Sequence, residues 1–162
     1  MFYFAYGSNM DKEDLDKWCE NRRLPKIEFL SISPAKLNGY KLCFNYFSSS
    51  RNAGAANIME SRNDCVYGLL LEIKDSDIEV IRRKEGYSRD PSKCYYDEIS
   101  VNVEKFDGAL IRNVKIYKVV KHREKPEHQL PTRYYMQLII RNAKKYNFPK
   151  DYIQFLKSIK TI

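Results

Sequence analysis

MFYFAYGSNM, residues 1–10, is the stretch from which the rest of the fold can be built. Its first six residues are apolar and mostly aromatic, which predicts a short buried strand. The strand stops at Gly7-Ser8-Asn9, because these residue types favour turns and helix caps. A helix is expected next, since Asp11 suits its N-cap and apolar residues recur at i, i+3 and i+4 over positions 15–19. The opening stretch therefore predicts a strand, a tight turn and a helix in direct succession.

Later segments add strands and helices without regular alternation. We expect strands at residues 40–47, 53–59, 65–73, 95–103 and 111–120, a short helix from Asp75 to Glu85, and helical segments after Pro131 and Pro149. Asp107-Gly108 predicts a hairpin between the last two strands. This order favours an α+β fold, with a mixed, mainly antiparallel sheet curled into a small barrel with flanking helices. Residues 1–162 are expected to form a single domain.

Three connecting segments carry expectations of their own. Pro25 and Pro34 predict a loop, and Ser48–Asn52 is expected to be a flexible surface connection. Gly54-Ala55-Ala56 indicates either close approach by another backbone or a ligand, or small core residues beneath a bulky aromatic side chain. Both interpretations of these small residues remain open.

The composition limits the class of protein. With 43% apolar and 14% aromatic residues, a chain of 162 residues can bury a sizeable core. No apolar run is long enough to span a membrane, and no basic segment precedes the apolar start, so we expect a cytoplasmic protein. The net charge of +8 is spread over short basic pairs rather than gathered in one block. This distribution favours a solvated surface and disfavours nucleic acid as a partner.

The cysteines do not suggest a metal centre. Cys19, Cys43, Cys65 and Cys94 are far apart in the sequence, with no CxxC pair and no histidine cluster at metal-ligand spacing. We expect reduced, mostly buried thiols and no metal site.

Two features carry potential chemistry. A strand that runs into Gly7-Ser8-Asn9 before a helix leaves backbone N–H groups free at the positive end of the helix dipole, where anions and developing oxyanions bind. A plain helix cap explains the same residues. Glu85 lies beside Gly86 at the expected end of a helix and is a candidate acid–base residue, although a glutamate in such a place is commonly solvated. Taken alone, each feature is compatible with a functional role and with a purely structural one.

Together, FAYGSNM (residues 4–10) and KEGY (residues 84–87) resemble the two signatures of the gamma-glutamylcyclotransferase family, in the same order and at compatible separation. The resemblance covers nearly the whole chain, because residues 54–58 and 66–70 are similar to the family's paired strands and residues 131–159 to its C-terminal helical segments. It implies a compact mixed barrel with flanking helices. It also implies a cofactor-independent enzyme that cyclises the γ-glutamyl group of γ-glutamyl amino acids or peptides to 5-oxoproline and releases the amine.

The resemblance also implies roles for individual residues. Glu85 is the expected catalytic residue, which takes a proton from the substrate ammonium and passes it to the leaving amine. To act near neutral pH its pKa must be raised by partial burial, with Tyr87 or Tyr96 as the expected neighbours. The backbone N–H groups of residues 6–8 would hold either the substrate carboxylate or the oxyanion. The expected substrate-binding residues are Tyr3, Phe4, Ala5, Tyr6, Gly7, Ser8, Asn9, Tyr96 and Tyr135.

The chain departs from the family pattern at Ser88–Lys93, which lengthens the path from Glu85 to Tyr96. The insertion contains the cations Arg89 and Lys93. They either favour an anionic leaving group near the pocket mouth or are loop residues with no role in binding. The expected partner is a small γ-glutamyl compound, and a homodimer is left open. One alternative function is a cyclotransferase for γ-glutamylamines or glutathione. The alternative of another class is a non-catalytic module that binds a small metabolite or nucleic acid.

Overall fold

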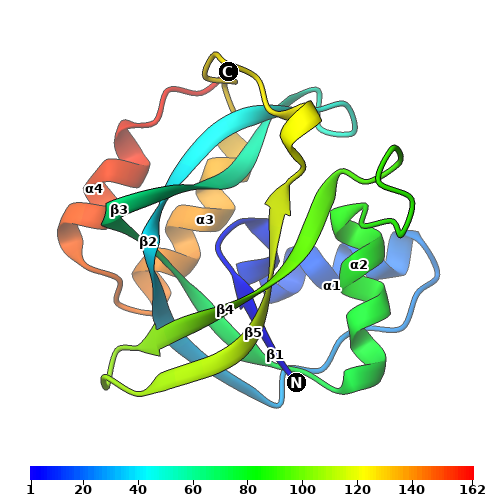
Figure 1. Ribbon diagram of the computed structural model, residues 1–162, viewed down its shortest axis with the longest axis horizontal. Helices are drawn as coiled ribbons and strands as arrows, with labels where there is room; N and C mark the ends of the chain where they lie inside the picture. Colours follow the sequence, from blue (N-terminus) through cyan, green and yellow to red (C-terminus); the bar gives the residue numbers. More distant parts are fainter.

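The computed structural model describes residues 1–162 (Figure 1). The strands are β1 (Phe2–Ala5), β2 (Ser31–Ser48), β3 (Ala53–Glu72), β4 (Tyr96–Lys105) and β5 (Leu110–Val119). The helices are α1 (Lys12–Asn21), α2 (Ile78–Glu85), α3 (Arg133–Lys145) and α4 (Lys150–Ser158). Short 3-10 turns occupy Ser8–Met10, Asp75–Asp77 and Lys121–Arg123.

The five strands close into a barrel in the order β1-β3-β2-β4-β5. Neighbouring strands are antiparallel except for β1 and β5, which run parallel where Tyr3 lies opposite Lys115. The predicted α+β fold with a mixed, mainly antiparallel barrel and flanking helices is therefore confirmed. Asp107-Gly108 forms the predicted hairpin turn between β4 and β5.

The predicted loop at Pro34 is wrong, because β2 already begins at Ser31 and Pro34 lies opposite Leu69 of β3. The carbonyl of Pro34 accepts a hydrogen bond from Phe106 N, so the missing N–H of Pro34 also faces β4. The paired register of β2 with β4 begins only at Ala35. Proline is tolerated here because it lies just beyond that ladder.

The predicted pair of strands at residues 53–59 and 65–73 is one continuous strand, β3. Both halves pair with β2 rather than with each other. The polar segment Ser61–Asp64, which resembles a turn in the sequence, falls where the register with β2 shifts opposite Gly39. Polar residues are accommodated because they lie at an irregular, mostly exposed part of the strand.

Local sequence sets the helix ends around the later site. Asp11 Oδ1 accepts a hydrogen bond from Asp14 N at 3.0 Å, which confirms the predicted N-cap of α1. Helix α2 ends at Glu85 because Gly86 takes up a left-handed conformation, with φ of 64°. Glu85 is thus the last residue of α2.

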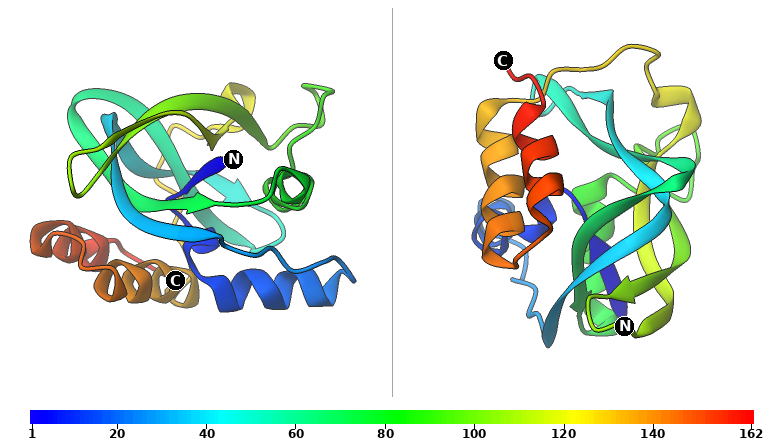
Figure 2. Two further views of the ribbon diagram at one scale, coloured as in Figure 1. Left: turned by 90° about the horizontal axis from the view of Figure 1, so that it is seen from below. Right: turned by 90° about the vertical axis from the view of Figure 1, so that its left-hand side faces the viewer.

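The helices cover the barrel unequally. Figure 2 shows α1, α3 and α4 in one layer beside the barrel, whereas α2 lies apart from them. A cluster of 32 buried side chains joins the barrel to these helices. The face of α3 that carries Tyr135, Leu138 and Ile139 is buried. None of the helices combines the length and apolar character needed to cross a membrane.

Candidate active site

A cleft of about 660 Å³ lies where several chain segments meet: the turn after β1, one side of α1, the end of α2, the β2–β3 turn and the start of α3. Both sequence signatures line it, through Tyr6 to Asn9 and through Lys84 to Gly86. The fold therefore brings the two signatures together, although α1 and the whole of β2 and β3 separate them in the sequence.

The Glu85 carboxylate is held by two neutral donors. Asn9 Nδ2 donates a hydrogen bond to Glu85 Oε1 at 2.6 Å, and the Tyr3 hydroxyl donates to the same oxygen at 3.2 Å. Asn9 Nδ2 also donates to the Tyr3 hydroxyl at 2.9 Å. These contacts fix the orientation of the Asn9 amide, because only its nitrogen can donate to a carboxylate. Its Oδ1 is buried and has no hydrogen-bond partner.

Burial raises the pKa of the Glu85 carboxyl above its ordinary value. The positive charge of Lys84, the hydrogen bond from Tyr3 and the charge of Arg51 act in the opposite direction. Burial also raises the pKa of the Tyr3 hydroxyl, which therefore stays protonated near neutral pH and acts as a donor. The cluster thus contains one carboxyl group, that of Glu85, whose pKa is shifted toward neutral pH.

The other tyrosines form hydrogen-bonded walls. The Tyr6 hydroxyl donates to Tyr117 O at 2.6 Å, and the Tyr96 hydroxyl donates to Ala56 O at 2.8 Å. The Tyr135 hydroxyl accepts from Ala56 N at 3.3 Å. A Cβ at Gly7 would lie 2.9 Å from the Tyr135 hydroxyl, so this position of the turn requires glycine while Tyr135 occupies its place.

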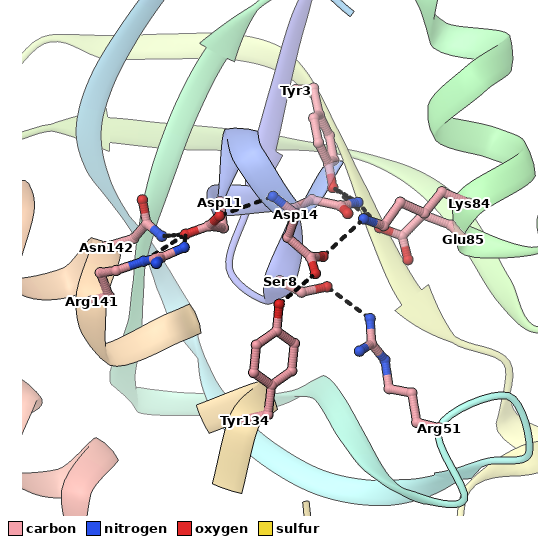
Figure 3. Close-up of polar contacts among 11 residues, drawn as sticks. Tyr3, Ser8, Asp11, Asp14, Arg51, Lys84, Glu85, Tyr134, Arg141 and Asn142 are labelled. Atoms are coloured by element: carbon pink, nitrogen blue, oxygen red, sulfur yellow. Dashed lines mark hydrogen bonds and ion pairs between the residues drawn. The ribbon is translucent and has the colours of Figure 1, made fainter. Parts of the chain in front are cut away.

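A buried carboxylate anchors the turn to α3. Asp11 Oδ2 accepts hydrogen bonds from Arg141 NH2 at 2.6 Å and from Asn142 Nδ2 at 2.7 Å (Figure 3). Because the other oxygen of Asp11 caps α1, this side chain connects α3 with both the 3-10 turn and α1. The position of Asn9 relative to Tyr135 therefore depends on Asp11.

Most of the predicted site residues line the cleft: Tyr3, Tyr6, Gly7, Ser8, Asn9, Glu85, Tyr96 and Tyr135. Phe4 and Ala5 do not, because their side chains are buried in the core. The expected neighbour Tyr87 also lies outside the cleft, with its ring 5.4 Å from the Arg82 guanidinium. Arg89 and Lys93 of the insertion are not part of the lining either.

At Gly54 the structure supports one of the open interpretations, close approach by another backbone. The carbonyl of Gln129 lies where a side chain at Gly54 would be, so another backbone approaches closely at this residue. Ala55 and Ala56 line the cleft instead. Strand β3 thus contacts the segment before α3 at Gly54 and faces the cleft at the next two residues.

Sequence reasoning missed the charged groups of the cleft other than Glu85, and three of these, Arg51, Lys84 and Asp14, make contacts within the site. Arg51 was assigned to a surface connection, but its NH2 group donates to Ser8 Oγ at 3.0 Å. Lys84 lies 3.4 Å from Asp14 Oδ2, and its side chain is only 5% exposed. Because Lys84 precedes Glu85 in the sequence, its presence in the cleft could have been predicted. Nothing in the sequence connects Asp14 with residue 84. No group of three or more His, Cys, Asp or Glu side chains is arranged to hold a metal ion.

Comparison with known proteins gives consistent matches. The model of the AIG2-like family matches residues 65–156. The gamma-glutamylcyclotransferases of cattle (Bos taurus) and mouse (Mus musculus) are each 29% identical over 161 residues, covering 97% of this chain and 77% of the relative. The solved structure of a gamma-glutamyl cyclotransferase is similar with a TM-score of 0.79 and 27% identity, covering 100% of this chain and 89% of that chain.

Proposed function

Because the chain belongs to the AIG2-like family, we propose that it is a gamma-glutamylcyclotransferase, which converts a γ-glutamyl compound to 5-oxoproline and a free amine. Family membership confirms the resemblance predicted from the sequence. One observation carries the assignment of the site: a single carboxylate with a raised pKa, Glu85, is hydrogen-bonded to Asn9 and Tyr3 in the cleft.

The reaction needs proton transfer between two nitrogens of one substrate. The α-nitrogen forms a bond to the γ-carbonyl carbon, and the bond between this carbonyl carbon and the leaving nitrogen breaks. With both amines counted as ammonium ions, two protons pass from the α-nitrogen to the leaving nitrogen. Glu85 is proposed to carry each proton in turn, because a carboxyl with a raised pKa can both accept and return a proton near neutral pH.

Asn9 and Tyr3 are proposed to direct this transfer. They donate only to Oε1 of Glu85, so Oε2 is left to exchange protons with substrate. The buried, unpartnered Oδ1 of Asn9 is an acceptor that suits an N–H of the substrate α-ammonium group. An ammonium held by Asn9 Oδ1 would lie beside Glu85, because the same amide group contacts the carboxylate through its nitrogen.

Gly7 is proposed to bind an oxygen of the glutamyl group, either the α-carboxylate or the γ-carbonyl. Its backbone N–H donates to no other backbone group, and the residue lines the cleft. An amide donor positioned before reaction costs no reorganisation when charge develops on a carbonyl oxygen. Because nucleophile and carbonyl belong to one molecule, holding the chain in a ring-like conformation supplies much of the rate enhancement.

The direct test is to incubate the purified protein with γ-glutamyl-alanine and to measure 5-oxoproline by mass spectrometry. We expect 5-oxoproline and free alanine in equal amounts. The matched control is α-glutamyl-alanine. Its γ-carboxyl group is not joined to an amine, so it should give no enzyme-dependent product. Glutathione and γ-glutamyl-ε-lysine in the same assay separate the alternative leaving groups. No 5-oxoproline from any of these γ-glutamyl compounds would overturn the proposal.

A further inference from the structure

The cleft contains more positive charge than its own acids neutralise. Its charged lining residues are Asp14, Lys17, Arg22, Arg51, Arg83, Lys84 and Glu85. The two lysines have acidic partners, since Lys17 pairs with Glu13 and Lys84 with Asp14. The three arginines form no ion pair with any residue of the chain. Three guanidinium groups in one cleft are thus free to pair with a ligand.

Of these arginines, only Arg51 both stacks on an aromatic ring and donates to a side-chain hydroxyl. Its guanidinium stacks over the Tyr135 ring, with 4.5 Å from Cζ to the ring centroid, and donates one hydrogen bond to Ser8 Oγ at 3.0 Å. A guanidinium has five N–H groups, so most of its donors remain available. Figure 3 shows Arg51 reaching from the β2–β3 turn toward Ser8, whereas Glu85 comes from α2. The two side chains therefore approach the cleft from different elements.

The other two arginines extend the positive charge toward solvent. Arg22 and Arg83 are exposed, whereas Arg51 is half-buried. The glutamyl group must lie with its reacting atoms at Glu85, and the leaving amine occupies the space between there and the cleft opening. A glutamyl group carries only one carboxylate, for which the Gly7 amide is already a candidate donor. The arginines consequently face the part of the substrate that departs.

We propose that Arg51 binds a carboxylate of the leaving amine and so determines which γ-glutamyl compounds bind. This inference rests on the proposed cyclotransferase function. Arg51 lines the cleft, whereas the insertion cations Arg89 and Lys93 lie outside it. The binding of an anionic leaving group is therefore assigned to Arg51 and not to the insertion. Arginine suits this role because its planar fork matches the two oxygens of a carboxylate.

Binding to the Glu85→Gln protein tests the proposal without turnover. Isothermal titration calorimetry compares γ-glutamyl-glutamate with γ-glutamyl-glutamine amide, in which both carboxylates of the leaving amine are replaced by carboxamides of nearly the same shape. We expect the acidic ligand to bind at least about tenfold more tightly. Adding Arg51→Gln should bring the two affinities close together. Adding Arg112→Ala, which removes an exposed charge outside the cleft, should leave their ratio unchanged.

Three results would overturn the inference: equal binding of the two ligands, binding of neither, or an Arg51→Gln effect that weakens both equally. The last result would assign Arg51 to the glutamyl carboxylate instead. A thermal unfolding curve for each variant separates loss of binding from loss of folding. Failure of the proposed function can be distinguished from failure of this inference. In that case the wild-type protein forms no 5-oxoproline, while the preference for the acidic ligand persists.

Discussion

Glu85 and Glu98 are two partly buried glutamates whose hydrogen-bond donors differ. Glu85 accepts hydrogen bonds from neutral donors, Asn9 and Tyr3. Glu98 accepts from the Arg82 guanidinium through both oxygens, at 2.8 Å each, and from the Tyr117 hydroxyl at 2.7 Å. Burial raises the pKa of Glu85, whereas the Arg82 hydrogen bonds lower the pKa of Glu98 to about 2.

This difference separates a reactive carboxyl from a structural one. A carboxylate bound by a guanidinium remains ionised at any physiological pH and cannot carry a proton. A buried carboxylate bound by amide and hydroxyl groups keeps a fixed orientation but can be protonated. The Tyr3 ring contacts the Tyr117 ring edge to face, with 5.8 Å between centroids. Because Tyr117 donates to Glu98 and Tyr3 donates to Glu85, the structural Glu98 group also supports a donor of the reactive carboxyl. Burial, together with donors that carry no charge, distinguishes the candidate acid–base residue.

The largest expected effect comes from Glu85→Gln, which retains the shape of the side chain but removes the proton carrier. The rate of 5-oxoproline formation should fall by about 100- to 10,000-fold. The free energy of unfolding should change by less than about 1 kcal/mol, because no charged partner loses its ion pair. Steady-state kinetics and urea unfolding measure the two quantities. Full activity in this variant would exclude Glu85 as the proton carrier.

Glu98→Gln should give the opposite pattern. Its side chain is 6% exposed, and the change leaves the Arg82 guanidinium without its bidentate partner. We expect a loss of about 2 kcal/mol in unfolding free energy near neutral pH. The fall in kcat should be far smaller than for Glu85→Gln. If this variant instead lost activity and kept its stability, the contrast between the two glutamates would be wrong.

The same variant has a defined pH dependence. The folded-state pKa of Glu98 is lowered, so its ionised form stabilises the protein above the ordinary glutamate pKa of about 4.3. That contribution is lost as the pH falls from there toward about 2. The stability difference between wild type and Glu98→Gln should therefore narrow over this range in urea unfolding experiments.

The smallest effect is expected from Tyr3→Phe. This change removes a hydrogen bond that lowers the pKa of Glu85, so that pKa should rise further above its ordinary value. Because Glu85 must be ionised to accept a proton, the acid limb of kcat/KM should move to higher pH, by about one unit or less. Tyr152→Phe, a change outside the cleft, is the matched control. A shift to lower pH would contradict the assigned direction of the Tyr3 contact.

Short-range patterns were enough to predict much of this molecule. The strand before Gly7, the cap at Asp11, the end of α2 at Gly86 and the Asp107-Gly108 hairpin all depend on residues within a few positions of one another. The predicted loop at Pro34 and the predicted gap between strands 53–59 and 65–73 were wrong for the complementary reason. Whether a proline or a polar run ends a strand depends on which strand lies beside it, and that neighbour is distant in the sequence.

The candidate site divides in the same way. The sequence by itself determined the turn at Gly7–Asn9 and a glutamate at a helix end, and their resemblance to a family linked them. Only the tertiary structure decided that Asn9 and Tyr3 contact Glu85, that Glu98 is committed to Arg82, and that Arg51 enters the cleft. The reason is physical: a residue type states what a side chain can donate or accept, whereas its pKa and its partner depend on burial and on neighbours that barrel closure supplies.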